Sequence, residues 1–245
     1  MLSKLKEKLK GSSGARNAAR ELEQENALLQ LGKYDTQFLI GDSTSMIGSR
    51  WNEARDALAG LARTALKYDN DGIEIFFLND VNAGRTVKTD QDVKQLFASV
   101  TQSHGTPTGK RLDDLLTAYI NKIEAAKQKT GSIDPVTTGI KPLNLIVITD
   151  GAPSDDPENV IIEAARRLDA GKFSLTQVGI QFIQVGDDAW ASKALRDMDN
   201  NLSATNAIRD IVDTRPYTGK RLTAELLVTM LLGGINRRID KLENV

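Results

Sequence analysis

The sequence of 245 residues contains no cysteine and a single histidine, His104. Without cysteine the chain can form no disulfide, no thiolate metal site and no cysteine nucleophile. The lone histidine also removes most histidine-based metal sites, and a Ser-His-Asp triad would have to use His104 itself. Because His104 stands among serine, threonine and glycine, we expect it to be a solvated loop residue. The absence of cysteine is in keeping with a reducing compartment.

Excess charge and long hydrophobic runs are lacking as well. With 32 basic and 33 acidic residues the formal net charge is -1, which gives no general electrostatic footprint for nucleic acid. The longest apolar runs are far shorter than a membrane span. Residues 1–10 have no apolar core of the kind found in a secretory signal. We therefore expect a cytoplasmic protein that does not bind nucleic acid.

Residues 1–32 differ from the rest and predict an N-terminal helical arm or linker. MLSKLKEKLK (1–10) places its leucines on one helical face with lysines around them, which fits a solvated helix better than a helix lying on a membrane surface. After a flexible GSSG (11–14), the segment ARNAARELEQENALLQL carries about two heptads, too few for an independent coiled coil. We expect this helix to dock on the main domain or on a neighbouring copy, which would give a homo-oligomer.

From residue 33 onward, strand-like and helix-like segments alternate. Apolar runs predict strands at 37–40, 73–78, 143–149 and 176–186. Helical spacing predicts helices at 51–68, 91–100, 111–129, 157–170, 192–202 and 222–242. Mostly apolar strands that alternate with helices are typical of a parallel sheet covered on both faces, so residues 33–245 are expected to form an α/β, doubly wound domain. Ligands of such sheets bind beyond the carboxyl ends of the strands.

Three polar loops stand at or near these expected strand ends. GDSTS (41–45) follows the first strand, GTPTG (105–109) precedes the helix at 111–129, and DGAPSDD (150–156) follows the strand at 143–149. Each loop alone has a simpler explanation, because Ser, Thr and Asp commonly cap helices. Together the loops offer only oxygen ligands, which suit Mg²⁺ or Mn²⁺.

This set of loops resembles the metal-ion-dependent adhesion site of the von Willebrand factor type A (vWA) domain, the fold also found in integrin I domains. The family pattern is Asp-x-Ser-x-Ser after the first strand, a threonine in a middle loop and Asp-Gly after a later strand. FLIGDSTSM, GTPTG and VITDGAPSDD are similar to these elements in that order. The opening LGKYDTQFLI and the ending RDIVDTRPYTGKRLTAELLVTMLLGGINRRIDKL resemble cytosolic fungal members, so the likeness covers about residues 33–242. It implies a non-enzymatic protein-binding module whose metal ion accepts a carboxylate from the partner.

The resemblance also implies which residues bind the metal. Ser43, Ser45 and Thr106 would be direct ligands, and Asp150 would be an anionic or water-mediated one. Thr108 is the fallback for Thr106. The surface around the ion would include Met46 and Ile47, whereas Trp51 is expected to be buried.

The sequence departs from the family pattern at Gly41. When Ser43 and Ser45 are aligned with the two family serines, Gly41 takes the place of the first aspartate, and Asp42 stands one residue later. A shift of one residue along an extended backbone turns a side chain to the opposite face. Loss of a carboxylate about 4–6 Å from a dication forfeits roughly 3–4 kcal/mol at an effective dielectric of ~20.

Three explanations of this departure remain open. The loosened backbone at Gly41 lets Asp42 turn toward the ion, the site is degenerate, or Gly41 is a variant residue. We expect Mg²⁺ or Mn²⁺ to bind weakly or not at all.

Two other functions fit parts of the sequence. A metal-independent, self-assembling scaffold would use the N-terminal helix and the helix at 222–242. A metal-dependent phosphohydrolase would use Asp42 or Asp150, but no nucleophile–base pair stands beside them. We favour the interaction module over both.

Three further segments are expected to play minor parts. The basic pair Lys110–Arg111 should face solvent or an acidic partner. DTRPYTGKRL (213–222) should be a loop before the last helix rather than a basic-aromatic patch. Asp155 and Asp156 should cap the helix at 157–170.

Overall fold

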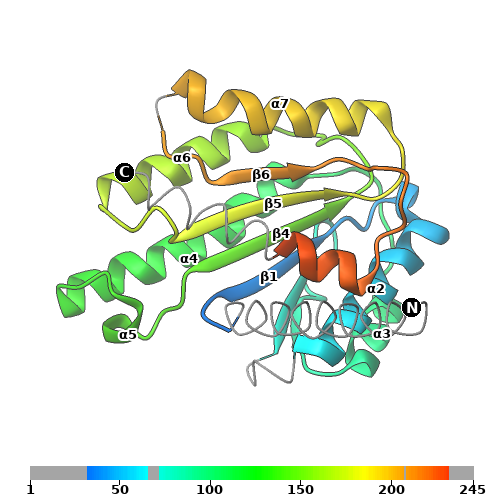
Figure 1. Cartoon of the computed structure of the whole chain (residues 1–245), viewed down its shortest axis with the longest axis horizontal. Helices are drawn as coiled ribbons and strands as arrows, with labels where there is room; N and C mark the ends of the chain where they lie inside the picture. Colours follow the sequence, from blue (N-terminus) through cyan, green and yellow to red (C-terminus); the bar gives the residue numbers. More distant parts are fainter. Residues whose placement is uncertain (1–31, 66–71, 207, 232–245) are drawn as a thin grey trace, which may run out of the picture.

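The computed structural model describes residues 32–65, 72–206 and 208–231 (Figure 1). Within these residues the chain forms a six-stranded sheet of order β3-β2-β1-β4-β5-β6. All neighbouring strands are parallel except the pair β2–β3, which is antiparallel. The strands are β1 Asp35–Ile40, β2 Ile73–Phe77, β3 Arg85–Val87, β4 Leu143–Thr149, β5 Val178–Gln184 and β6 Val212–Arg215. The prediction of an α/β, doubly wound, mostly parallel sheet is confirmed.

Helices connect the strands and lie on both sides of the sheet (Figure 1). They are η1 Thr44–Met46 (a 3-10 turn), α2 Ser49–Ala65, α3 Asp90–Ser99, α4 Thr108–Thr130, α5 Pro135–Thr138, α6 Pro157–Ala170 and α7 Ala189–Asn206. Residues 224–231 are helical too, which covers part of the helix expected at 222–242. The arm expected over residues 1–32 lies outside the described residues except for its last residue. No helix in the described ranges is long and apolar enough to cross a membrane.

Alternation along the central strands sends side chains into two separate cores. Phe38 and Ile40 pack with α2, α3 and the helix at 224–231, whereas Leu39 between them packs with α4, α6 and α7. Successive side chains of a strand point to opposite faces, which accounts for this division. All seven residues of β4 and of β5 are buried. Double-sided burial therefore explains why these strands are apolar runs rather than alternating ones.

Two edge strands did not follow from the sequence. β6 occupies the start of the segment 213–222, which was wrongly predicted to be only a loop. It is a short strand that pairs with β5 in the register Ile180↔Val212 to Ile183↔Arg215. β3 is three residues long and pairs with β2. Both are too short to show a period of their own, so pairing with a neighbour defines them.

The helix starts were predicted in part. Asp156 caps α6 as expected, because its carboxylate accepts a hydrogen bond from the backbone N–H of Asn159 at 3.2 Å. The same role was wrong for Asp155. Its carboxylate accepts hydrogen bonds from the N–H groups of Gly109 and Lys110, both at 2.8 Å. It thus satisfies two free N–H donors in the first turn of α4. Sequence proximity favoured the nearer helix, but the tertiary fold brings α4 alongside.

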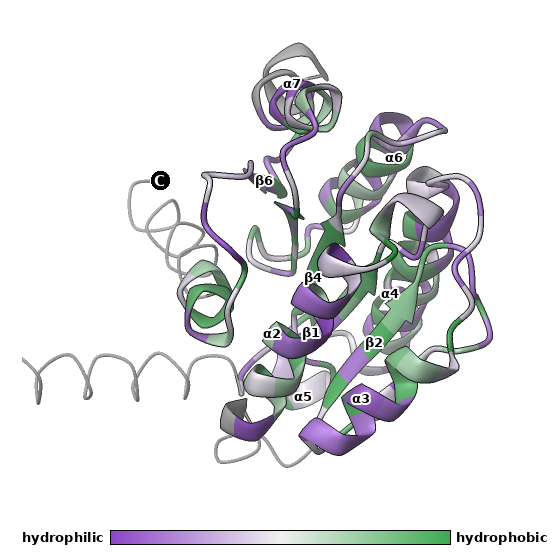
Figure 2. Cartoon of the chain, turned by 90° about the vertical axis from the view of Figure 1, so that its right-hand side faces the viewer, coloured by the Kyte–Doolittle hydropathy of each residue, from purple (hydrophilic) through white to green (hydrophobic). Residues whose placement is uncertain are grey.

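The loops after β1 and β4 leave the sheet at its topological switch point. β1 lies between β2 and β4, so the chain departs from β1 in one direction and reaches β4 on its other side. Such a divergence opens space at the carboxyl ends of the strands. Seen from that end, the sheet lies between α2 and α3 on one side and α4 and α6 on the other (Figure 2).

The two tryptophans test the packing of the α2 face. Trp51 is buried, as expected, with its ring centroid 4.6 Å from that of Phe97 and 5.8 Å from that of Phe77, whereas Trp190 is 77% exposed. Trp51→Ala should lower the free energy of unfolding by about 3–5 kcal/mol, because it empties a packed aromatic site. Trp190→Ala, the matched control, should change it by less than about 0.5 kcal/mol. Urea unfolding measures both, and equal losses would contradict this packing.

Candidate functional site

The loop after β1 is fixed by backbone contacts with distant segments. The N–H of Gly41 donates to the carbonyl of Ile148 at 2.7 Å, which continues the ladder with β4. Ser103 then binds the loop twice, donating to the carbonyl of Asp42 at 3.0 Å and accepting from the N–H of Thr44 at 2.9 Å. The chain next turns into η1. These contacts hold the serines of the loop in place at the carboxyl end of β1.

Ser43, Ser45 and Asp150 form one hydrogen-bonded cluster. The two serine Oγ atoms are 2.8 Å apart, and Oδ1 of Asp150 accepts from Ser45 at 3.0 Å and from Ser43 at 3.4 Å. The hydroxyl of Ser43 does not cap η1, the 3-10 turn that follows it. The sequence therefore selected three residues that do come together across about a hundred positions of chain.

Arg50 completes this cluster, and sequence reasoning missed it. From the first turn of α2 its Nη1 donates to Oδ2 of Asp150 at 2.8 Å. The Asp150 side chain is 1% exposed, whereas that of Arg50 is 32% exposed. A buried carboxylate is stable in its charged form when it is paired and hydrogen-bonded, and here both conditions hold. The only sequence signal was a basic residue shortly after the serine loop, which by itself does not identify a partner.

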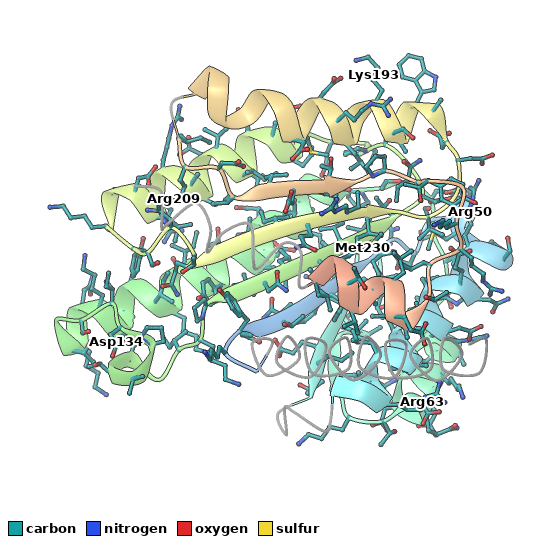
Figure 3. The ribbon with its side chains drawn as sticks, in the orientation of Figure 1. Arg50, Arg63, Asp134, Lys193, Arg209 and Met230 are labelled. Carbon is teal, nitrogen blue, oxygen red and sulfur yellow. The ribbon has the colours of Figure 1, made fainter. Side chains whose placement is uncertain are left out.

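Gly186 makes room for the guanidinium of Arg50. It follows β5 and has a φ of 80°. A Cβ at Gly186 would lie 2.5 Å from Nε of Arg50, closer than non-bonded atoms approach. The absence of a side chain there thus allows Arg50 to lie across the carboxyl ends of the strands. Figure 3 shows Arg50 at this end of the molecule, with Asp134 at the opposite end.

Asp42 points away from the cluster. Its carboxylate is fully buried and accepts three hydrogen bonds from the turn after β2. Oδ1 accepts from the backbone N–H of Asn79 at 2.8 Å and from its side-chain amide at 3.1 Å, and Oδ2 accepts from the N–H of Asp80 at 2.8 Å. Of the three explanations for Gly41, this arrangement does not fit the one in which Asp42 turns toward the ion. The carboxylate instead ties the end of β1 to the turn between β2 and β3.

Thr106 lies beside the cluster rather than within it. Ser154 holds its backbone from both sides: its Oγ accepts from the N–H of Thr106 at 3.1 Å, and its N–H donates to the carbonyl at 2.9 Å. The Thr106 Oγ1 is 3.8 Å from where a Cβ on Gly151 would stand, so it faces the loop that follows β4. The fallback residue, Thr108, is buried, and its hydroxyl donates to the carbonyl of Thr106 at 3.3 Å.

The surroundings of the cluster differ from expectation at two positions. Ile47 is 61% exposed, as predicted for the surrounding surface, but Met46, the last residue of η1, is fully buried. Lys110 is exposed, whereas Arg111 is buried and donates from Nε to the carbonyl of Phe77 at 3.1 Å. Arg111 therefore supports the end of β2 instead of facing solvent. His104 is an exposed loop residue, as predicted.

The donor set does not fit a divalent cation while Arg50 holds Asp150. Hard cations prefer several oxygen ligands, with carboxylates that balance the charge. Here the only carboxylate in the cluster is paired with a guanidinium, and the hydroxyls of Ser43 and Ser45 are neutral. At about 4 Å and an effective dielectric of ~20, an ion pair of this kind is worth roughly 4 kcal/mol, which a metal would have to overcome. No group of three or more His, Cys, Asp or Glu side chains in the described ranges is placed to hold a metal.

A groove of about 650 Å³ lies at the opposite end of the sheet, near the amino ends of β1 and β2. Gln37 and Glu74 on its wall bind each other at 2.7 Å. None of the predicted site residues lines this groove. The charged cluster and the groove are therefore separate features.

Comparison with known proteins gives matches to solved structures at low sequence identity. No protein-family model matches the chain, and no curated protein matches it. One similar solved structure is proximal thread matrix protein 1 from the mussel byssus, at 16% identity over 83% of this chain and 46% of that one, with a TM-score of 0.43. Another is the pilus adhesin SpaC from Lactobacillus rhamnosus GG in its open conformation, at 15% identity over 85% of this chain and 30% of that one, with a TM-score of 0.42. The chain thus spans less than half of either matched protein. Similarity at these scores carries no information on function, which is therefore inferred from the geometry of the site.

The position of Asp42 predicts a structural role for its carboxylate. Asp42→Asn should lower the free energy of unfolding by about 2–3 kcal/mol, because an amide replaces a charged acceptor of buried hydrogen bonds. Asp187→Asn, at a side chain that is 86% exposed, is the control and should cost less than about 0.5 kcal/mol. Urea unfolding, with Mn²⁺ titration of the same variants, separates the two roles. Unchanged stability with loss of Mn²⁺ binding would make Asp42 a ligand instead.

Proposed function

We propose that this protein is a non-enzymatic protein–protein interaction module of the vWA type. It binds its partner at the carboxyl ends of the parallel strands, the carboxyl edge of the sheet. The observation that carries the proposal is the cluster of Ser43, Ser45, Asp150 and Arg50 at the switch point between β1 and β4. Open α/β sheets bind ligands at this position. The sequence resemblance to the adhesion-site loops supports the same edge.

Exposed apolar side chains lie at the same edge. Ile47 follows β1, Val81 follows β2 and Trp190 follows β5, with exposed fractions of 61%, 48% and 77%. Aromatic and aliphatic groups around a polar centre are common anchors in protein interfaces. The opposite edge also exposes apolar residues, among them Val136 at 91%. The charged cluster, and not apolar exposure alone, therefore favours the carboxyl edge.

The chemistry of the cluster gives little support to an enzyme. Both aspartates of the phosphohydrolase alternative, Asp42 and Asp150, are committed to hydrogen bonds from neighbouring residues. His104 is exposed, and its Nδ1 lies 3.4 Å from the hydroxyl of Thr44; within the described ranges no third group orients the ring. A nucleophile needs a base that is itself held in position.

Self-assembly remains the alternative function. Its proposed elements, the N-terminal helix and the far end of the last helix, lie outside the described residues. Concentration-dependent mass that disappears when residues 1–32 are removed would favour it over a heterologous partner.

Site-specific photo-crosslinking tests which edge binds. A benzophenone side chain at Ile47 or Trp190 should give a discrete crosslinked product with a second protein in the native cells. The same group at Val136 is the matched control, because Val136 is also apolar and exposed but lies next to Asp134 at the other end of the molecule (Figure 3). It should give no such product.

The alternatives predict other patterns in this experiment. Products from Val136 alone would place the interface at the amino edge of the sheet. A product with twice the mass of the chain would favour self-assembly.

A further inference from the structure

We infer that Arg50 is the built-in cation of this site: its guanidinium takes the position of a metal ion at Asp150 and offers its exposed side to a carboxylate of the partner. This inference rests on the proposed function, because only that function requires a partner. The role of Arg50 at Asp150 does not depend on it and can be tested on the isolated protein.

The first argument is the geometry of the acceptor. The two oxygens of Asp150 are divided between neutral and charged donors: Oδ1 takes the hydroxyls of Ser43 and Ser45, and Oδ2 takes Nη1 of Arg50. A dication among these oxygens would need the carboxylate that Arg50 already neutralises. One positive charge thus suffices for the one carboxylate that the cluster contains, which matches the glycine at position 41.

The second argument is that the arginine is only partly used. Its side chain is 32% exposed. Nη1 is taken by Asp150, while Nη2 has only Asp187 within ion-pair range among the described residues, at 3.7 Å, which exceeds a hydrogen-bond length. A guanidinium carries five N–H donors in a planar fork that fits a carboxylate. Nη1 also donates to the carbonyl of Ser45 at 3.4 Å, and no hydrogen bond within the described residues uses the N–H donors of Nη2 and Nε.

The third argument is that the fold provides for this arginine. Gly186, with its positive φ, leaves the space that Nε and Cζ of Arg50 occupy. Arg50 also contacts the carbonyl of Ser45 at 3.4 Å, so it spans the loops after β1, β4 and β5. A side chain held between three loops is a positioned group rather than a solvated one.

The ligand class that follows is a carboxylate, from an acidic side chain or a chain terminus of the partner. An arginine that is already paired on one side still carries hydrogen-bond donors on the other. Binding of this kind should resist chelators and weaken with salt, because no metal takes part and the pair is partly exposed.

Metal titration tests whether Arg50 occupies the cation position. Mn²⁺ binding is measured by calorimetry on the full chain, on Arg50→Gln, and on Arg50→Gln combined with Gly41→Asp. A Cβ at position 41 would meet atoms of Ile148 and Thr149 at 3.4 Å, which is van der Waals contact. Arg50→Gln should bind Mn²⁺ at least about tenfold more tightly than the natural chain, and the double variant more tightly still. Arg55→Gln is the control, since Arg55 has the same 32% exposure and a 2.8 Å pair with Asp56. It should leave Mn²⁺ binding unchanged.

Acetate titration tests the ligand class on the natural chain. Backbone amide resonances of Ser45 and Ile47 should shift saturably with sodium acetate, but not with acetamide at matched ionic strength. The shifts should be lost in Arg50→Gln and kept in Arg55→Gln. If Arg50→Gln does not fold, the comparison of acetate with acetamide on the natural chain still decides.

The inference is overturned by Mn²⁺ binding to the natural chain that is as tight as to Arg50→Gln. It is overturned equally if acetate leaves the natural chain unchanged or shifts Arg50→Gln to the same extent. Crosslinks from Ile47 that persist in Arg50→Gln, together with either result, would retain the proposed function without this role for Arg50. If the metal and acetate titrations give the expected results but no partner is crosslinked, the role of Arg50 is retained without the proposed function.

Discussion

Burial of both faces of the central strands is the constraint on which the rest of the structure depends. β4 and β5 are buried along their whole lengths, and helices cover each side of the sheet. Polar side chains of the sheet can therefore reach solvent at its two ends, where the strands stop. The carboxyl end collects the serines, the aspartates and Arg50, and the order of the strands leaves space there for a ligand. The site is thus a consequence of the layered core.

Charge balance then decides what the site can hold. A buried carboxylate needs hydrogen bonds or a positive partner, and Asp150 has both, with Arg50 at 2.8 Å. The loop that resembles a metal-site loop has a glycine where the family has a carboxylate, and the next carboxylate, Asp42, holds the turn after β2. One negative charge and one positive charge remain in the cluster. A monovalent side-chain cation matches this cluster better than a dication does, so the proposed interaction is one between side chains.

Much of the fold could be predicted from the sequence, because long apolar strands and periodic helices carry their signal locally. The ranges of β4 and α6 were predicted residue for residue. The short edge strands β3 and β6 were not, since pairing with a neighbour defines them. For the site, the resemblance to the adhesion-site loops named Ser43, Ser45 and Asp150 together, and their side chains do form one hydrogen-bonded cluster. The direction of the Asp155 carboxylate was not readable, because a capping residue serves whichever helix the fold brings near it.

The sequence by itself determined the doubly wound sheet and the three loops at its end, because each depends on residue type and spacing along the chain. The departure at Gly41 came from the resemblance to the family pattern. The tertiary structure decided the partners of the charged groups. It turned Asp42 toward Asn79 and Asp80, buried Arg111 under the turn after β2, and set Arg50 against Asp150 across the space left by Gly186. Charges interact through space between segments far apart in the chain, so only the folded arrangement fixes which cation meets which carboxylate.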